Sequence, residues 1–188
     1  PDVLYYGPGL HEMASPVRLT TGQEVYIAAG AWLKAVMPED EEPVRTRPGT
    51  DLPVYVALFT ANEARDIVIR GRGVIDMSAL DWSARSCITA GRCENVRIEG
   101  VTIIDCPSWT IVAAQSEDVT VENVKLIGHR QSNDGIDICN SRRVTVRDCF
   151  TRVGDDGIVL KTFPNGGPAH DVLVEGCVVW NDKCRAIG

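Results

Sequence analysis

The feature that most constrains the fold is a repeat of roughly two dozen residues that runs through most of the chain. Five segments carry it, each with a polar residue followed by an alternating apolar stretch: DIVIRGRGVID, NVRIEGVTIID, DVTVENVKLIG, RVTVRDCFTRVG and DVLVEGCVVWN, beginning at Asp66, Asn95, Asp118, Arg143 and Asp171. Their starts lie 29, 23, 25 and 28 residues apart. Self-similarity at this period is typical of a solenoid, in which each repeat buries its apolar face against its neighbours.

The pattern within each repeat predicts strands. β-branched residues alternate with polar ones, and apolar residues do not recur at the 3.6-residue spacing of an amphipathic helix. A second short apolar stretch follows, as in WTIVAA, DGIDIC and DGIVLK. We therefore expect an all-β, single-stranded parallel β-helix with coils of roughly 22–29 residues. Residues 1–188 form one such domain, with an irregular N-terminal segment at 1–22 and a C-terminus that falls within a strand, as in a truncated solenoid.

The composition limits the kinds of partner that this chain is expected to bind. The net charge of −7 argues against nucleic acid, whose binding depends on a basic face. No run of about 18 apolar residues is present, so we expect no membrane span. No His, Cys and Asp cluster has the spacing of a metal site, and we expect no metal and no cofactor. Of the seven cysteines, Cys149 and Cys177 share an interior position with Val101 and Val124, which predicts small buried apolar residues. The oligomeric state stays open.

Stacked coils turn equivalent residues into columns, because successive strands lie about 4.8 Å apart. Aligning the second strands predicts one outward column: Ser86, Trp109, Asp134, Asp156 and Lys183. Two carboxylates then lie on neighbouring coils, and their repulsion raises the pKa of at least one of them. Such a pair of like charges does not stabilise the fold, so the column indicates a functional role for these residues.

Asp155 adds a third acid to the pair. It precedes Asp156 in GDDGIVLK, where Gly154 and Gly157 are expected to let the backbone bend so that both carboxylates reach one cleft. The alternative is that each Asp-Gly serves its own turn, as this dipeptide commonly does. Two Asp-Gly-Ile copies 22 residues apart, absent from the other coils, favour a catalytic site at Asp134, Asp155 and Asp156.

Four further side chains are candidates for binding substrate. Trp109 offers a flat apolar face to a sugar ring, and Lys161 and Lys183 offer charges to anionic or hydroxylated groups. His129 is placed at the cleft rim, although a solvated turn histidine is the simpler interpretation. Asp137, in the same motif as Asp134, is expected to have a structural role.

These motifs resemble a known family. PSWTI at 107–111, SNDGID at 132–137 and GDDGIVLK at 154–161, preceded by GRGVID at 71–76, are similar in order and spacing to the signatures of polygalacturonase-like glycoside hydrolases, family 28, with dextranase and isopullulanase as distant relatives. The resemblance implies a right-handed β-helix of the pectin-lyase-like group that cleaves a polysaccharide or oligosaccharide with inversion. It also implies a secreted or periplasmic location.

The resemblance further implies roles for the acids, with Asp155 as the general acid and with Asp134 and Asp156 activating the attacking water. Inverting hydrolysis separates acid and base by about 6.5–9.5 Å. A stacked pair is too close for opposite roles, which agrees with a joint water site at Asp134 and Asp156. Crowding by two carboxylates is expected to keep Asp155 protonated.

The departures from the family leave the substrate open. Asp182-Lys183-Cys184 stands where the family has Gly-His-Gly, so Lys183 replaces its histidine, and the family's basic cluster would lie beyond Gly188. A pectic polymer, a neutral glucan, a galactan and a branched glycan remain candidates. Two other functions also remain: a β-helix lyase that uses Ca²⁺ and a basic residue such as Lys183, and a non-catalytic solenoid that binds glycans or builds a structure.

Overall fold

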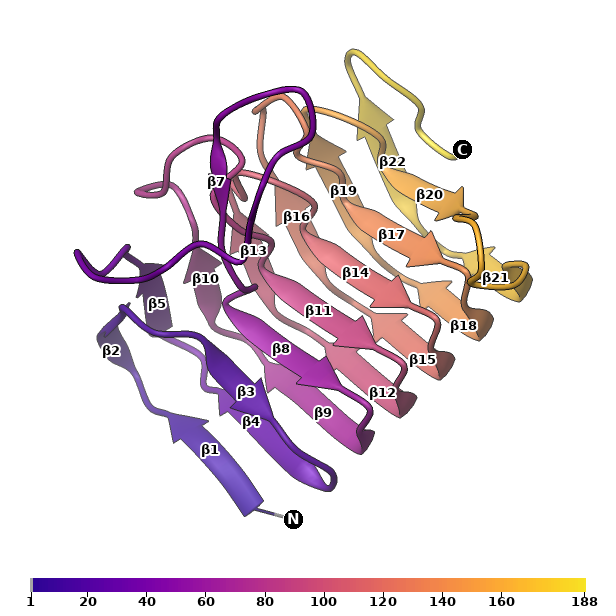
Figure 1. The fold of residues 1–188 in the computed structure, drawn as a ribbon. Coiled ribbons are helices and arrows are strands. Elements are labelled where there is room, and N and C mark those ends of the chain that lie inside the picture. The colour runs from indigo at the N-terminus through magenta and orange to yellow at the C-terminus, as the bar shows by residue number, and fades with distance from the viewer. Residues whose placement is uncertain (1) are drawn as a thin grey trace.

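Three parallel sheets form the faces of a solenoid in the structure, a computed structural model that describes residues 2–188 (Figure 1). The first sheet contains β1 (Asp2–Tyr6), β4 (Gln23–Ile27), β9 (Arg65–Gly71), β12 (Glu94–Glu99), β15 (Glu117–Glu122), β18 (Arg142–Arg147) and β21 (His170–Glu175). The second contains β2 (Gly9–Met13), β5 (Ala31–Ala35), β10 (Val74–Asp76), β13 (Thr102–Ile104), β16 (Lys125–Ile127), β19 (Phe150–Val153) and β22 (Val178–Asn181). The third contains β3 (Val17–Leu19), β8 (Phe59–Asn62), β11 (Ile88–Gly91), β14 (Ile111–Ala114), β17 (Ile136–Cys139) and β20 (Ile158–Lys161).

The predicted all-β parallel β-helix is therefore confirmed. Each repeated segment supplies one strand to the first sheet and one to the second, and the short apolar stretch after it supplies the third. None of the described residues belongs to a helix with the length and apolarity that crossing a membrane requires.

The N-terminal segment differs from the prediction. Residues within 1–22 were expected to be irregular, but β1, β2 and β3 add a complete coil to the three sheets. β1 pairs with β4 in register, with Leu4 opposite Val25.

The polar residue that begins each repeat makes a corner of the solenoid. Asp66, Asn95, Asp118 and Asp171 have φ between 54° and 57°, and Arg143 has φ 51°. Asn and Asp tolerate this left-handed conformation better than most residues with a side chain. One left-handed residue at this corner of each repeat turns the chain sharply into the first sheet, so the same conformation recurs at the same place.

The interior is a stack of apolar columns. Ile75, Ile103 and Leu126 pair in register on neighbouring coils and are at most 1% exposed. The predicted column of Val101, Val124, Cys149 and Cys177 is also present, and its backbone bonds link each coil to the next. Cys149 is buried, and desolvation raises the pKa of its thiol to about 11. Cys177 is only half-buried, so of these two cysteines the predicted burial holds for Cys149 alone; both are free thiols.

One long excursion leaves the stack between β5 and β8. It is a largely exposed segment that includes an antiparallel hairpin of β6 (Arg45–Thr46) and β7 (Pro53–Val54). An ion pair between Glu41 and the buried Arg85 ties it to the solenoid. The excursion projects from one edge of the coils in Figure 1.

Removing one interior side chain tests the packing of these columns. We expect Ile103→Ala to lower the free energy of unfolding by about 2–5 kcal/mol, since the cavity cannot close against the coils on both sides. Thr102→Ala, at the next and outward-facing position, is the control and should cost about 1 kcal/mol or less. Urea unfolding followed by circular dichroism measures both, and similar losses would contradict the column arrangement.

Candidate active site

The backbone ladder of the third sheet determines which side chains share the outward column. The Thr110 N–H donates to the Asp134 carbonyl, and the Gly135 N–H donates to the Asp156 carbonyl. These bonds place Trp109, Asp134 and Asp156 on successive coils, as the sequence predicted. The next bond, from the Gly157 N–H to the Arg185 carbonyl, continues the column to Arg185.

The prediction that Lys183 continues the column was therefore wrong. Asn181 Oδ1 accepts bonds from the backbone N–H groups of Lys183 (3.0 Å) and Cys184 (2.9 Å), which folds 181–184 into a turn. This turn delays the return of the chain to the sheet by two residues, and Ile187 rather than an earlier residue bridges to Ile158. Aligning Ile187 with Ile158 in the sequence would have found Arg185.

The glycines around the acids permit close approach of neighbouring coils rather than a special bend. Neither Gly154 nor Gly157 has a positive φ. A Cβ atom on Gly157 would lie 2.6 Å from the Ala186 carbonyl oxygen, and one on Gly154 would lie 2.1 Å from the Arg130 carbonyl oxygen. The physical reason expected for these glycines was wrong, although they do allow Asp155 and Asp156 to sit beside neighbouring coils.

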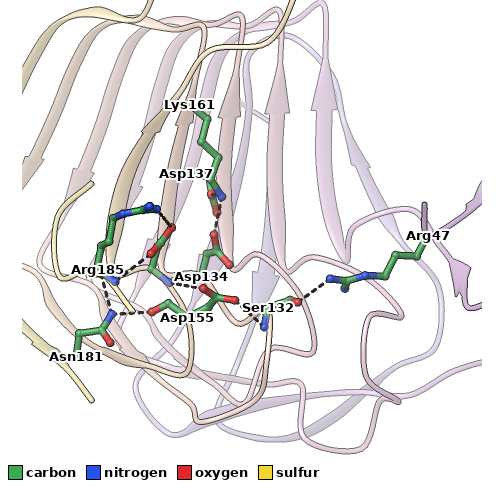
Figure 2. A network of polar contacts seen from close by, with 9 residues as sticks. Arg47, Ser132, Asp134, Asp137, Asp155, Lys161, Asn181 and Arg185 are labelled. Carbon is green, nitrogen blue, oxygen red and sulfur yellow. Dashed lines mark hydrogen bonds and ion pairs between the residues drawn. The ribbon is translucent and has the colours of Figure 1, made fainter. Parts of the chain in front are cut away.

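The Asp155 carboxylate is held by backbone donors from two coils. Its Oδ2 accepts from the Ser132 N–H at 3.0 Å, and its Oδ1 accepts from the Asp156 N–H at 3.1 Å (Figure 2). Asn181 Nδ2 donates to the Asp155 carbonyl at 2.7 Å. The side chain is half-buried, so its position is fixed while part of it reaches solvent.

The three predicted acids converge. Asp134 and Asp156 are 3% and 8% exposed. One carboxylate oxygen each of Asp155 and Asp156 and the Sγ of Cys184 lie within 4.8 Å of one another. Burial raises the pKa of the Asp134 carboxyl; Lys161 partly opposes this, and the charge of Asp155 adds to it. The site therefore concentrates negative charge in a poorly solvated place.

Lys161 lies between two buried carboxylates. Its Nζ is 2.6 Å from Asp134 Oδ2 and 2.5 Å from Asp137 Oδ1. Burial disfavours the charged amine, but the two carboxylates outweigh it, and the pKa of Lys161 is raised. The same Nζ lies 3.6 Å from the centroid of the Trp109 ring. Lys161 thus neutralises part of the site and positions Asp134.

Asp137 is the most deeply buried acid of the cluster. It is fully buried, and its Oδ2 has no hydrogen-bond partner among the described residues. Burial, with the charge of Asp134 added, raises the pKa of Asp137 well above its ordinary value. The structural role expected for Asp137 agrees with this position beneath the column.

Asp156 is paired with Arg185, which sequence reasoning missed. The Arg185 N–H donates to Asp156 Oδ1 at 3.0 Å, and its Nη1 lies 3.5 Å from Oδ2. The guanidinium is exposed at the surface of the site (Figure 2). Arg185 therefore lies where the column predicted Lys183.

Lys183 and His129 lie together, apart from the acids. Both line a hollow of about 430 Å³ with Arg152, Asp182 and Gly154. His129 Nδ1 is 3.1 Å from Asp105 Oδ1, and its side chain is exposed. Gly154, the residue before Asp155, is the part of this hollow that adjoins the acid site. His129 and Lys183 therefore line the hollow and do not lie among the acids.

A larger groove of about 670 Å³ lies on the N-terminal side of the acids along the same column. Trp109 and Phe163 stack in its wall, with ring centroids 6.4 Å apart, and Ser86 and Ser108 supply hydroxyl groups. Residues of the excursion's hairpin also line it. The predicted sugar platform at Trp109 thus lines a groove, one coil away from Asp134.

Comparison with known proteins gives a consistent result. The sequence model of "Glycosyl hydrolases family 28" matches residues 50–178. A probable polygalacturonase of Arabidopsis thaliana is 28% identical over 132 residues, which cover 62% of this chain and 28% of that protein. A polygalacturonase of Chamaecyparis obtusa is 26% identical over 136 residues, covering 58% and 26%. The matched part is thus little more than a quarter of either relative.

Two solved structures share the fold. An exopolygalacturonase from Thermotoga maritima superposes with a TM-score of 0.83 at 23% identity, covering 97% of this chain and 53% of that one. A polygalacturonase from Erwinia carotovora gives a TM-score of 0.75 at 17% identity, covering 95% and 57%. At these identities the structures bear on the fold alone, and they agree with a β-helix.

The buried acids predict an unusual pH dependence of stability. A carboxyl with a raised pKa binds more protons folded than unfolded, so its contribution to stability falls as pH rises above the ordinary value of about 3.9. We expect the melting temperature of Asp137→Asn, relative to the wild type, to rise as pH increases from about 4.

Asp118→Asn should show the opposite trend, because hydrogen bonds from Arg143 lower the pKa of Asp118. Its melting temperature relative to the wild type should fall as pH rises towards the ordinary value of about 3.9 and stay level above it. A flat or falling difference for Asp137→Asn would contradict the buried-acid assignment.

Proposed function

Because the chain belongs to glycosyl hydrolase family 28, we propose that it hydrolyses glycosidic bonds in a polysaccharide with inversion of configuration. The observation that carries this proposal is the convergence of Asp134, Asp155 and Asp156 next to the coil of Trp109, which lines a groove. Hydrolysis of this kind needs a proton donor for the leaving oxygen and a base for water. Three acids in different surroundings supply both.

In this proposal Asp155 is the general acid. It is the most accessible of the three, and it lies outside the stacked column that contains the other two. The backbone N–H groups of Ser132 and Asp156 hold its carboxyl in one orientation. A fixed, partly exposed carboxyl suits proton transfer to a glycosidic oxygen that enters from the groove.

Asp134 and Asp156 hold and deprotonate the attacking water. They lie on adjacent coils, and each is paired with a cation, Lys161 and Arg185 respectively. The raised pKa of Asp134 makes its carboxylate a stronger base than an ordinary aspartate. The paired cations keep two neighbouring carboxylates usable in one site.

The proposed substrate is a pectic polymer, since the curated relatives named above are polygalacturonases. A neutral glucan, a galactan and a branched glycan serve as test substrates for the alternatives. Polymers of this kind lie outside the cytoplasm, which supports the proposed secreted or periplasmic location.

The lyase alternative is weaker on two observations. A lyase needs a basic residue with a free electron pair, but Lys161 is bound by two carboxylates that raise its pKa. Lys183, the other candidate base, lies outside the column of acids. Metal dependence remains part of the test.

Release of reducing ends from pectic, α-glucan and galactan polymers tests the proposal. We expect activity on one of them that survives EDTA. Asp155→Asn should lower kcat by about 10²–10⁴-fold, because proton donation is lost. Asp171→Asn, at an exposed corner, is the matched control and should retain wild-type activity. An EDTA-sensitive, ultraviolet-absorbing product would favour the lyase, and binding without release the non-catalytic solenoid.

The stereochemistry of the product is a separate prediction. We expect the first anomer released to have the configuration opposite to that of the cleaved bond, since water attacks from the face opposite the leaving group. Proton NMR during the first minutes of reaction measures this before mutarotation. Retention of configuration would refute the joint water site of Asp134 and Asp156.

A further inference from the structure

The hairpin excursion brings a cation to the groove from outside the stacked coils. Arg45 and Arg47, on and just after β6, line the 670 Å³ groove that Trp109 also lines. The excursion is anchored by the ion pair of Glu41 with Arg85, whose side chain is 1% exposed. Arg45 and Arg47 therefore lie on a segment that an ion pair anchors to the solenoid.

Arg47 is bound by uncharged groups. Its Nη1 donates to Ser83 Oγ at 3.1 Å. Its Nη2 donates to Ser132 Oγ at 2.8 Å (Figure 2). Its guanidinium also lies 4.7 Å from the centroid of the Trp82 ring. No ion pair formed within residues 2–188 includes Arg47.

The lack of a carboxylate partner distinguishes Arg47 from the ion-paired arginines on the surface of the solenoid. Arg70, Arg92 and Arg143, which are on the solvent face, each pair with an acid. Arg47 is half-buried and yet its charge is not compensated, in a protein of net charge −7. A half-buried, uncompensated guanidinium in a groove is a receptor for an anion.

The lining of the groove indicates which anion it takes. Trp109, Tyr55 and Phe163 supply aromatic faces, and Ser86 and Ser108 supply hydroxyl groups. Aromatic faces suit the apolar face of a sugar ring, and a planar guanidinium matches a carboxylate with two parallel bonds. A sugar that carries a carboxylate satisfies both requirements.

We propose that Arg47 is a specificity-determining residue that binds the carboxylate of a uronic acid unit held in the groove on the N-terminal side of the acids. The inference rests on the proposed hydrolase function, which it deepens by assigning a substrate contact. Its bond to Ser132, whose N–H holds Asp155, sets this subsite directly beside the proposed general acid.

A comparison of charged and uncharged substrates tests this assignment. We expect the wild type to prefer oligogalacturonate over its methyl ester, in which the carboxylate is masked. Arg47→Gln should raise KM for the free acid by about 10–100-fold, as loss of a charge-assisted bond does, and leave the KM for the ester unchanged. Arg47→Lys keeps the charge and should keep part of the preference.

Arg72→Gln is the matched control, because Arg72 is exposed at the corner between β9 and β10 and forms no ion pair in the described part of the chain. It should leave both KM values unchanged. Equal loss on acid and ester in Arg47→Gln would overturn the proposal, because Arg47 would then act only through Ser132 on Asp155. No change on either substrate would also overturn it.

Binding separates this inference from the proposed function. If the wild type hydrolyses neither substrate, the hydrolase proposal fails, and calorimetric titration with trigalacturonate still tests Arg47. Weaker binding to Arg47→Gln than to the wild type, with melting temperatures alike, supports the subsite. Equal binding, or no binding to the wild type, overturns it.

Discussion

The in-register hydrogen-bond ladder between coils is the constraint on which the rest of this molecule depends. Each coil repeats at one strand spacing, so a residue's position in the coil determines its neighbours above and below. Left-handed residues such as Asp66 and Asn95 turn the backbone at the same corner in coils of different lengths. The ladder therefore builds interior columns such as Ile75, Ile103 and Leu126, and it builds the acid column by the same geometry.

The same geometry brings like charges together, which opposes folding. Asp134 and Asp156 share a column, and Asp137 lies buried beside them. Lys161 offsets part of this cost, since its amine contacts two of these carboxylates at once. Burial, with the charge of a neighbouring carboxylate added, still raises the pKa values of Asp134 and Asp137. A site with that much unfavourable charge is typical of function rather than of stability.

Segments outside the hydrogen-bond ladder supply positively charged side chains to the site. The turn at 181–184 shifts the chain by two residues and delivers Arg185 to Asp156. The hairpin excursion brings Arg47 to a serine three coils further along the solenoid. These irregular segments add positive groups to a site whose regular part is acidic.

The repeat in the sequence was sufficient to predict the coils and their strands, because a fixed period determines how the coils stack. It also predicted the column that contains Cys149 and the proximity of Asp134 and Asp156. Trp109 and Asp155 followed from the same alignment. The contact of Arg47 with Ser132 was not predictable in this way, since a long excursion has no period to align. Arg185 was missed because the turn at 181–184 interrupts the period. The N-terminal coil was also missed, although β1 pairs with β4 in register. Local pattern thus defines the columns, and contacts between segments distant in sequence define which charges meet at them.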